Sequence, residues 1–123
     1  MTAKEAGDTL AKNAVFAVLS PARRKMLVQS GGSVQLSKGD KLFARGDAAN
    51  AAYAILSGEV EVTIEGPDGR SVFIARLGAG TVVGEMGVLD GVPRSADAHA
   101  TRKTELWRVD AKLVHDALTE EPG

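Results

Sequence analysis

Residues 84–96 read GEMGVLDGVPRSA, from Gly84 to Ala96, and they interrupt a succession of short strands. Their first part, residues 84–91, predicts a very short helix that begins after one glycine and ends at another. The first N–H groups of a helix have no partner within it and carry positive dipole character, so they favour an anion. Gly84 and Gly87 lack a Cβ atom, so a ligand could approach the backbone closely there. The stretch therefore indicates an anion-binding site.

Two charged side chains of this stretch, Glu85 and Arg94, fit such a site in different ways. A guanidinium donates two parallel hydrogen bonds to two phosphate oxygens, and Pro93 restricts how the chain reaches Arg94. A carboxylate beside an anion is repelled by it, so Glu85 is better matched to a hydroxyl donor, as the sugar of a nucleotide would supply. The simpler alternative is a surface ion pair between Glu85 and Arg94, which contributes less than about 1 kcal/mol to stability.

On either side of this stretch the chain has the pattern of short strands separated by glycines. Alternation is clearest at residues 59–64, where Val60, Val62 and Ile64 share one face. Many short strands at regular spacing predict a mainly β fold, as a sandwich, a jelly roll or a small barrel. The predicted strands cover residues 34–36, 41–43, 52–56, 59–64, 71–77 and 104–109, and another begins near Ser95.

Helical patterns flank the strands at both ends. Apolar residues recur at three- and four-residue spacing between Leu10 and Leu19, which predicts one helical face. Ser20 and Pro21 are typical of an N-cap and a first helical position, so a second helix begins there. Residues 111–120 predict a C-terminal helix. We expect one domain over residues 9–121, preceded by a disordered segment 1–8.

Length and charge narrow the class of protein. With 123 residues there is room for one domain with one core. Fifteen basic and sixteen acidic residues give a net charge of −1, so we expect no nucleic-acid contact by this chain itself. There is no signal-peptide pattern and no membrane-spanning run, which predicts a cytoplasmic location and no membrane partner.

Catalytic and metal-binding patterns are missing. There is no cysteine, which excludes disulfides, thiolate metal sites and a cysteine nucleophile. His99 and His115 stand alone, without the clustered ligands that a metal site or a metal-dependent cupin enzyme needs. We therefore predict no metal, no cofactor and no enzymatic activity.

Residues 84–96 closely resemble the phosphate-binding cassette of cyclic-nucleotide-binding domains, the family of catabolite activator protein and protein kinase A regulatory subunits. The resemblance extends from about Val15 to about Leu118. It includes the Gly39-Asp40 pair and the stretches 45–47 (Arg-Gly-Asp), 55–58 (Ile-Leu-Ser-Gly) and 105–106 (Glu-Leu). It implies a double-stranded β-helix, a jelly-roll-like β-roll, with N-terminal helices, a short cassette helix and a C-terminal helix. We call residues 84–96 the cassette below.

The resemblance also implies a role for each ligand-binding residue. Glu85 would accept a hydrogen bond from the ribose 2′-hydroxyl, beside the Gly84 backbone, and Arg94 would bind the exocyclic phosphate oxygens. The N–H groups of Met86 and Gly87 would complete the phosphate site, together with Ser95 through its N–H and hydroxyl groups. Two residues outside the cassette and one at its end complete the implied set: Val62 and Ile74, which would pack against sugar and base, and Ala96.

Three positions depart from the family's usual pattern. Ala79-Gly80-Thr81 stands where the family usually has Pro-Gly-Asp, and Val83 replaces a larger apolar residue. Asp97 occupies a position that is commonly apolar or Thr, so the strand that leaves the cassette is expected to be looser. None of these changes removes a residue of the implied ligand site.

The resemblance implies a regulatory sensor. It would bind cAMP, or alternatively cGMP, and switch an attached output such as a DNA-binding domain of a bacterial regulator. A homodimer is implied if a further C-terminal helix follows. The alternative is the same fold with a vestigial or differently liganded pocket, acting as a protein-interaction or dimerisation module.

Overall fold

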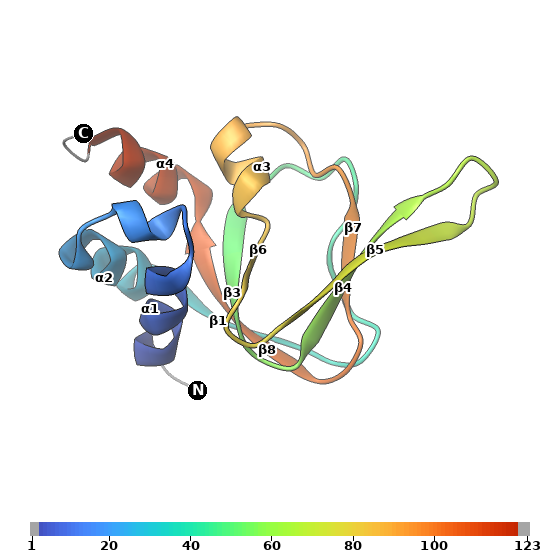
Figure 1. Cartoon of the computed structure of the whole chain (residues 1–123), viewed down its shortest axis with the longest axis horizontal. Helices are drawn as coiled ribbons and strands as arrows, with labels where there is room; N and C mark the ends of the chain where they lie inside the picture. The colour runs from blue at the N-terminus through green and yellow to red at the C-terminus, as the bar shows by residue number, and fades with distance from the viewer. Residues whose placement is uncertain (1–2, 121–123) are drawn as a thin grey trace.

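The computed structural model describes residues 3–120, with the helices gathered at one end and a roll of strands at the other (Figure 1). The predicted mainly β fold with flanking helices is confirmed. In chain order the elements are α1 (Ala3–Lys12), the 3-10 helix η1 (Phe16–Val18), α2 (Pro21–Gln29), β1 (Gly32–Leu36), β2 (Lys41–Phe43), β3 (Ala51–Ser57), β4 (Glu59–Glu65), β5 (Ser71–Gly78), β6 (Val82–Val83), α3 (Glu85–Asp90), β7 (Asp97–Ala100), β8 (Thr104–Asp110) and α4 (Ala111–Glu120).

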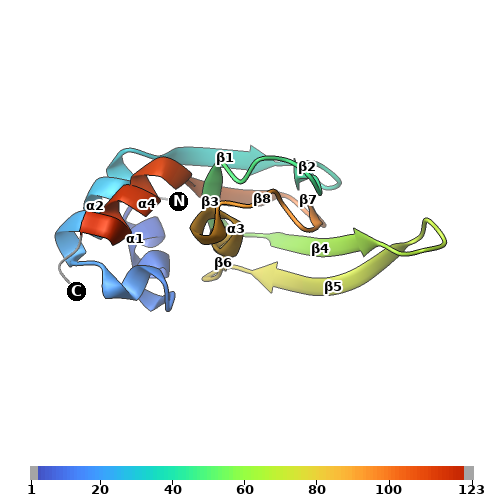
Figure 2. The ribbon, with the colours of Figure 1, turned by 90° about the horizontal axis from the view of Figure 1, so that it is seen from above.

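Two four-stranded antiparallel sheets make up the roll. One has the strand order β1-β8-β3-β6 and the other β2-β7-β4-β5. Alternating side chains of the two sheets meet between them, as expected for two half-buried faces. The hairpin of β4 and β5 projects beyond the rest of the roll (Figures 1 and 2). The buried members of this roll core are Ile55, Val60, Val83, Ala98 and Leu106.

A second core lies between the helices and the β1-β8-β3-β6 sheet, and we call it the helical core. Leu10 and Phe16 are fully buried there, and Leu27 and Val114 are each 1% exposed. Ser20 caps α2 as predicted, since its Oγ accepts a hydrogen bond from the N–H of Arg23 at 3.3 Å.

The N-terminal segment differs from the prediction. Residues 1–8 were expected to be disordered, yet α1 begins at Ala3, and the side chain of Ala6 is fully buried in the helical core. The apolar residues of α1 are few, so its helical state depends on packing against α2 and β3 rather than on its own pattern. Residues 1 and 2 and the predicted domain end at 121 lie outside the described residues.

The strands agree with the prediction except around the cassette. β6 was not predicted because it has only two residues, which form hydrogen-bonded pairs with Tyr53 and Ala54 of β3. β7 begins at Asp97, two residues after the predicted start near Ser95. Its first residue is well anchored, since the Asp97 carboxylate accepts a hydrogen bond from the N–H of Arg45 at 2.9 Å. The expectation of a looser strand at Asp97 stays a prediction, since the register of β7 against β2 shifts between Lys41 and Phe43.

Candidate functional site

The cassette helix α3 has six residues and lies between two glycines with left-handed backbone conformations. Gly84 precedes it with φ +87° and Gly91 follows it with φ +65°. Other residue types adopt these angles only with strain, so the two glycines confine the helix to this short segment. The short helix predicted within residues 84–91 is confirmed.

The backbone of Arg94 is held by the loop between β2 and β3. The N–H of Gly46 donates to the Arg94 carbonyl at 2.8 Å, and the Arg94 N–H donates to the Asp47 carbonyl at 2.8 Å. The Asp47 carboxylate in turn accepts from the N–H of Ala44 at 2.9 Å, which closes the loop on itself. The loop at Gly46 and Asp47, far from Arg94 in the sequence, thus fixes the position of the Arg94 backbone.

The Arg94 side chain points into the protein, and only 6% of the residue is exposed. Its Nη1 donates to the carbonyl of Gly84 at 2.7 Å, and its Nη2 donates to the carbonyl of Ala51. The guanidinium also lies over the ring of Phe43, with Cζ 4.2 Å from the ring centroid. Arg94 therefore joins the start of α3 to the start of β3.

The positive charge of Arg94 has no counter-ion. Within the described part of the chain no carboxylate forms an ion pair with it, and its buried Nε has no hydrogen-bond partner. Burial lowers the pKa of Arg94 from its ordinary value, although Tyr53 and Asp47 nearby raise it. Burying a cation without a paired anion is costly, so this site is suited to an anion from outside the chain.

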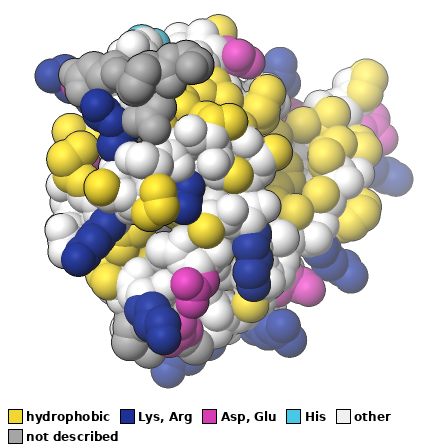
Figure 3. Space-filling view, turned by 60° about the vertical axis from the view of Figure 1, so that its left-hand side comes forward, with side chains coloured by type: hydrophobic (Ala, Val, Ile, Leu, Met, Phe, Trp, Pro, Cys, Tyr) yellow, Lys and Arg dark blue, Asp and Glu magenta, His cyan; other side chains and the backbone are white. Residues whose placement is uncertain are grey.

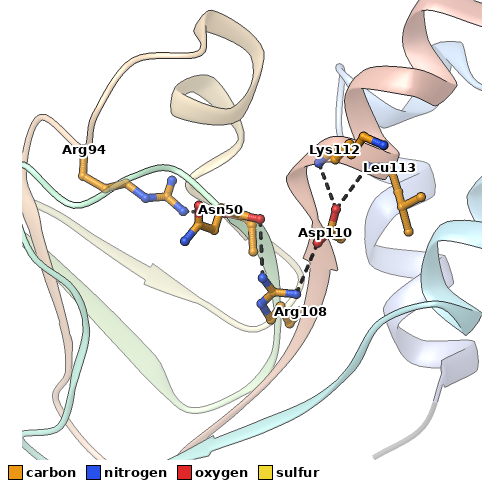
Figure 4. A network of polar contacts seen from close by, with 7 residues as sticks. Asn50, Arg94, Arg108, Asp110, Lys112 and Leu113 are labelled. Carbon is orange, nitrogen blue, oxygen red and sulfur yellow. Dashed lines mark hydrogen bonds and ion pairs between the residues drawn. The ribbon is translucent and has the colours of Figure 1, made fainter.

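A polar network connects the Arg94 site to the start of α4. Figure 4 shows the Arg94 guanidinium pointing toward Asn50, whose carbonyl accepts from Arg108 Nη2 at 3.5 Å. Arg108 Nη1 lies 3.8 Å from Asp110 Oδ2, and Asp110 Oδ1 accepts from the N–H groups of Lys112 at 2.9 Å and Leu113 at 3.2 Å. A displacement of residues 50–51 would therefore change the contacts of Arg108 and Asp110 at the N-terminus of α4.

Gly84 and Gly87 lie directly against the guanidinium. A Cβ atom at Gly84 would be 2.6 Å from Arg94 Nη1. A Cβ atom at Gly87 would be 3.4 Å from the same nitrogen and 3.1 Å from the Cβ of Ala49. Packing around Arg94 therefore favours glycine at residue 84 and leaves little room for a side chain at residue 87, and the role of both glycines in admitting a ligand stays a prediction.

Glu85 and Arg94 form no ion pair, so the interpretation of the two residues as a surface salt bridge is wrong. Arg94 is buried in its own set of contacts, whereas Glu85 is half-buried and turned toward the helices. The Glu85 Oε1 atom accepts from Nδ2 of Asn13 at 3.4 Å. Sequence reasoning did not find Asn13, because no local pattern links it to the cassette.

The remaining predicted site residues lie farther apart. Met86 is 59% exposed, Ser95 is exposed and Ala96 is half-buried at the two ends of the cassette. Val62 is half-buried and packs against the roll core. Ile74 is 51% exposed at a β-bulge, since Val62 pairs with Ala75 and the next residue of β4 pairs with residue 73. Figure 3 shows hydrophobic side chains exposed on this projecting hairpin.

A cavity of about 330 Å³ opens on the Arg94 guanidinium from the side of the β2–β3 loop. Arg94 is the one cationic side chain in its lining, and Phe43 and Tyr53 supply aromatic surface. The sequence contains only five aromatic residues, so the presence of two at one cavity is a signal that sequence reasoning missed. The lining residues are Leu42, Phe43, Asp47, Ala48, Asn50, Tyr53 and Arg94.

Residues 3–120 contain neither a cluster of metal ligands nor a helix that could span a membrane. No three His, Asp or Glu side chains come together in a way that could hold a metal ion. No helix in this range combines the length and apolar character needed to cross a membrane.

Comparison with known proteins identifies the family. The model of the cyclic nucleotide-binding domain matches residues 33–121, which include both sheets, the cassette and α4. The chain belongs to the cyclic nucleotide-binding domain family. The β-roll with its N-terminal helices, cassette helix and C-terminal helix, as the resemblance implied, is the fold of this domain family.

Relatives of this cyclic nucleotide-binding domain occur inside larger proteins. The chain is 36% identical over 90 residues to the lysophospholipase nte1 of Aspergillus oryzae, and the match spans 73% of this chain but 6% of that protein. The sensor domain of the transcriptional regulator DNR from Pseudomonas aeruginosa is 25% identical, with a TM-score of 0.84, covering 96% of this chain and 79% of that one. The EAL enzyme Bd1971 in its cAMP-bound form is 30% identical, with a TM-score of 0.68, covering 73% of this chain and 24% of that one.

Proposed function

We propose that this domain binds a 3′,5′-cyclic nucleotide, cAMP with cGMP as the alternative, and acts as a regulatory sensor without catalytic activity of its own. Arg94 binds the exocyclic phosphate oxygens, and Glu85 accepts a hydrogen bond from the ribose 2′-hydroxyl. The single observation that carries this proposal is the buried Arg94 guanidinium, which has no counter-ion and keeps an unpaired Nε. A cyclic phosphate supplies the missing negative charge and strong acceptors.

Ligand binding exchanges the partners of Arg94. The carbonyls of Gly84 and Ala51 now accept from Nη1 and Nη2, and phosphate oxygens replace them when the nucleotide enters. The exchange brings an anionic acceptor to a buried cation, and so supplies the counter-charge that the two neutral carbonyls do not. The N–H groups of Met86 and Gly87 and the exposed Ser95 complete the phosphate site.

The rest of the ligand is bound by less specific contacts. Gly84 leaves the backbone open beside the ribose, and Ala96 lies at the far end of the phosphate site. Val62 and Ile74 offer apolar surface to sugar and base, and Ile74 is exposed enough for a base to cover it. This part of the site is expected to contribute affinity rather than selectivity, because apolar contact distinguishes bases poorly.

The proposed output lies in an attached domain of a cytoplasmic regulator. The similarity to the DNR sensor domain supports a DNA-binding output, which would make this chain the sensing part of a transcriptional regulator. The net charge of −1 supports a chain that makes no nucleic-acid contact of its own. The polar network from Arg94 through residues 50–51 to α4 provides a route for the signal. A homodimer is proposed for the case in which a further helix follows α4.

A second candidate function has one observation in its favour. Two nitrogens of the Arg94 guanidinium are already bonded to carbonyls within the chain, so the pocket could be stable without a nucleotide. The domain would then serve as a protein-interaction or dimerisation module.

Isothermal titration calorimetry separates the two functions. The wild type is expected to release or absorb heat with cAMP or with cGMP, and Arg94→Ala is expected to weaken that binding by at least about tenfold. Arg94→Lys keeps the charge but loses the two parallel donors, so it should fall between them. Arg70→Ala is the matched control, because the Arg70 side chain is 88% exposed on the hairpin. No heat with either nucleotide at high micromolar concentration would favour the interaction module.

A further inference from the structure

Asn13 and Glu85 make a side-chain contact between two parts of the chain that are 72 residues apart. Asn13 lies in the turn between α1 and η1, and its Nδ2 is 3.4 Å from Glu85 Oε1. Among residues 3–120 the Glu85 carboxylate makes no other hydrogen bond or ion pair. The direction of the Glu85 side chain therefore depends on Asn13.

The orientation of the Asn13 amide follows from its other contacts. Its Oδ1 accepts from the N–H of Val15 at 2.9 Å and from the N–H of Phe16 at 3.3 Å. Only the oxygen of the amide can accept a hydrogen bond from a backbone N–H. The nitrogen must therefore be the end that faces Glu85, as a donor to the carboxylate.

Asn13 is the fixed partner of this pair. Its N–H donates to the Leu10 carbonyl at 3.0 Å, and its carbonyl accepts from the N–H of Ala17 at 2.8 Å. Next to it Phe16 is fully buried in the helical core. Glu85, in contrast, is the first residue of a six-residue helix with an exposed neighbour in Met86. The Asn13 amide therefore positions the carboxylate, and not the reverse.

We propose that Asn13 is a positioning residue that holds Oε1 of Glu85 and so directs Oε2 to a hydroxyl group of the ligand. This inference rests on the proposed function. A carboxylate has about four acceptor sites on its two oxygens, so one donor from Asn13 leaves the others free. At 3.4 Å the contact is long for a hydrogen bond, so the carboxylate keeps most of its capacity to accept from a ligand. Asn13 would thereby set the preference for ribose over deoxyribose.

The test compares cAMP with 2′-deoxy-cAMP by isothermal titration calorimetry on the wild type and on Asn13→Asp. This variant keeps an acceptor for the N–H groups of Val15 and Phe16, but it replaces the donor with a negative charge facing Glu85. The wild type should prefer cAMP by about tenfold, and the preference should fall about fivefold in Asn13→Asp, mainly through weaker cAMP binding. In a Glu85→Ala background Asn13→Asp should have no further effect on the preference.

Ser20→Ala is the matched control, since it removes another side-chain acceptor of a backbone N–H without touching Glu85, and it should leave the preference unchanged. A purely structural role for Asn13 would weaken the binding of both nucleotides equally, and that result would overturn the inference. An unchanged preference in Asn13→Asp, or equal wild-type affinity for the two nucleotides, would overturn it too. Failure of the proposed function itself is recognised separately, because the wild type would then bind neither nucleotide.

Discussion

At the scale of residues, Glu85 and Arg94 differ in how many contacts within the protein already occupy their polar atoms. Glu85 is half-buried and oriented by one amide, so it can accept a ligand hydroxyl without losing an existing strong contact. Arg94 must first release the carbonyls of Gly84 and Ala51. In the proposed function, phosphate binding is thus coupled to the protein's own hydrogen bonds, whereas hydroxyl recognition is nearly independent of them.

Gly84→Ala tests how closely the cassette is fitted around Arg94. An alanine at this position would strain the backbone, because φ is +87° there. Its Cβ atom would also lie 2.6 Å from Arg94 Nη1. We expect a loss of about 2–3 kcal/mol in the free energy of unfolding, measured by urea denaturation. Gly80→Ala is the control, because φ is +89° there and no atom lies within 4 Å of the added Cβ. It should cost only about 1 kcal/mol, and equal losses in the two variants would show that the contact with Arg94 is unimportant.

The parts of the site that could be predicted from the sequence are those that depend on neighbouring residues. The glycines at 84 and 87, the short helix and the pair of charged residues all lie within residues 84–96. The partners of Arg94 and Glu85 could not be predicted, because Ala51 is 43 residues away from Arg94 and Asn13 is 72 residues away from Glu85. Spacing along the chain carries no signal for such contacts, which only the folded roll brings about.

At the scale of elements, predictability follows the strength of the local pattern. The bounds of α4 coincide with the predicted residues 111–120, because its apolar residues repeat at helical spacing. β4 was predicted from strict alternation over residues 59–64. The first helix was placed too late, because the apolar pattern begins only at Leu10: α1 spans Ala3–Lys12, and the predicted face between Leu10 and Leu19 is divided by the turn before η1. The residues of α1 before Leu10 are largely polar, so only contacts with the helical core reveal why they are helical.

The turn before the cassette shows how a departure from the family pattern is accommodated. Thr81, at the usual place of an Asp, donates from its Oγ1 to the carbonyl of Gly78 at 2.6 Å. Its own carbonyl accepts from the N–H of Ile55 at 2.8 Å, and the N–H of Gly80 donates to the Ile55 carbonyl at 2.9 Å. The threonine thus supports the turn that leads into β6 and the cassette.

Asp110 is the N-cap of α4, and its substitution should weaken this helix, which the proposed function places on the route of the signal. Asp110→Ala removes the acceptor for the N–H groups of Lys112 and Leu113, and we expect it to cost about 1 kcal/mol, or about 5 °C in Tm. Asp110→Asn keeps an acceptor oxygen and should stay near the wild type. Asp116→Ala, on the same helix away from the cap, controls for the loss of charge. A Tm for Asp110→Ala equal to that of Asp116→Ala would contradict the capping role.

At the scale of the whole molecule, the two cores share the same strands. Ile55 of β3 and Leu106 of β8 face the roll core, whereas Ala54 of β3 and Val109 of β8 face the helical core. Side chains of these strands alternate between the two faces of one sheet. The loss of either core would therefore expose one apolar face of a sheet whose other face forms the second core. The indole of Trp107, on β8, also donates to the Val28 carbonyl of α2 at 2.9 Å, which ties the helices to the roll.

The sharing of β3 and β8 predicts that the domain unfolds as one unit. In urea, the fluorescence of Trp107, the one tryptophan, reports the contact between β8 and α2, and far-UV circular dichroism reports strands and helices together. The two transitions should coincide in the wild type.

Phe16→Ala removes a fully buried side chain of the helical core and should lower the free energy of unfolding by about 3–5 kcal/mol, moving both transitions equally. If the helices were an independent layer, Phe16→Ala would move the Trp107 transition to lower urea while much of the circular dichroism signal of the roll persisted. Coincident transitions would mean that a change at the helices is also a change in the stability of the roll, so a ligand that binds the roll would stabilise the helices by the same linkage.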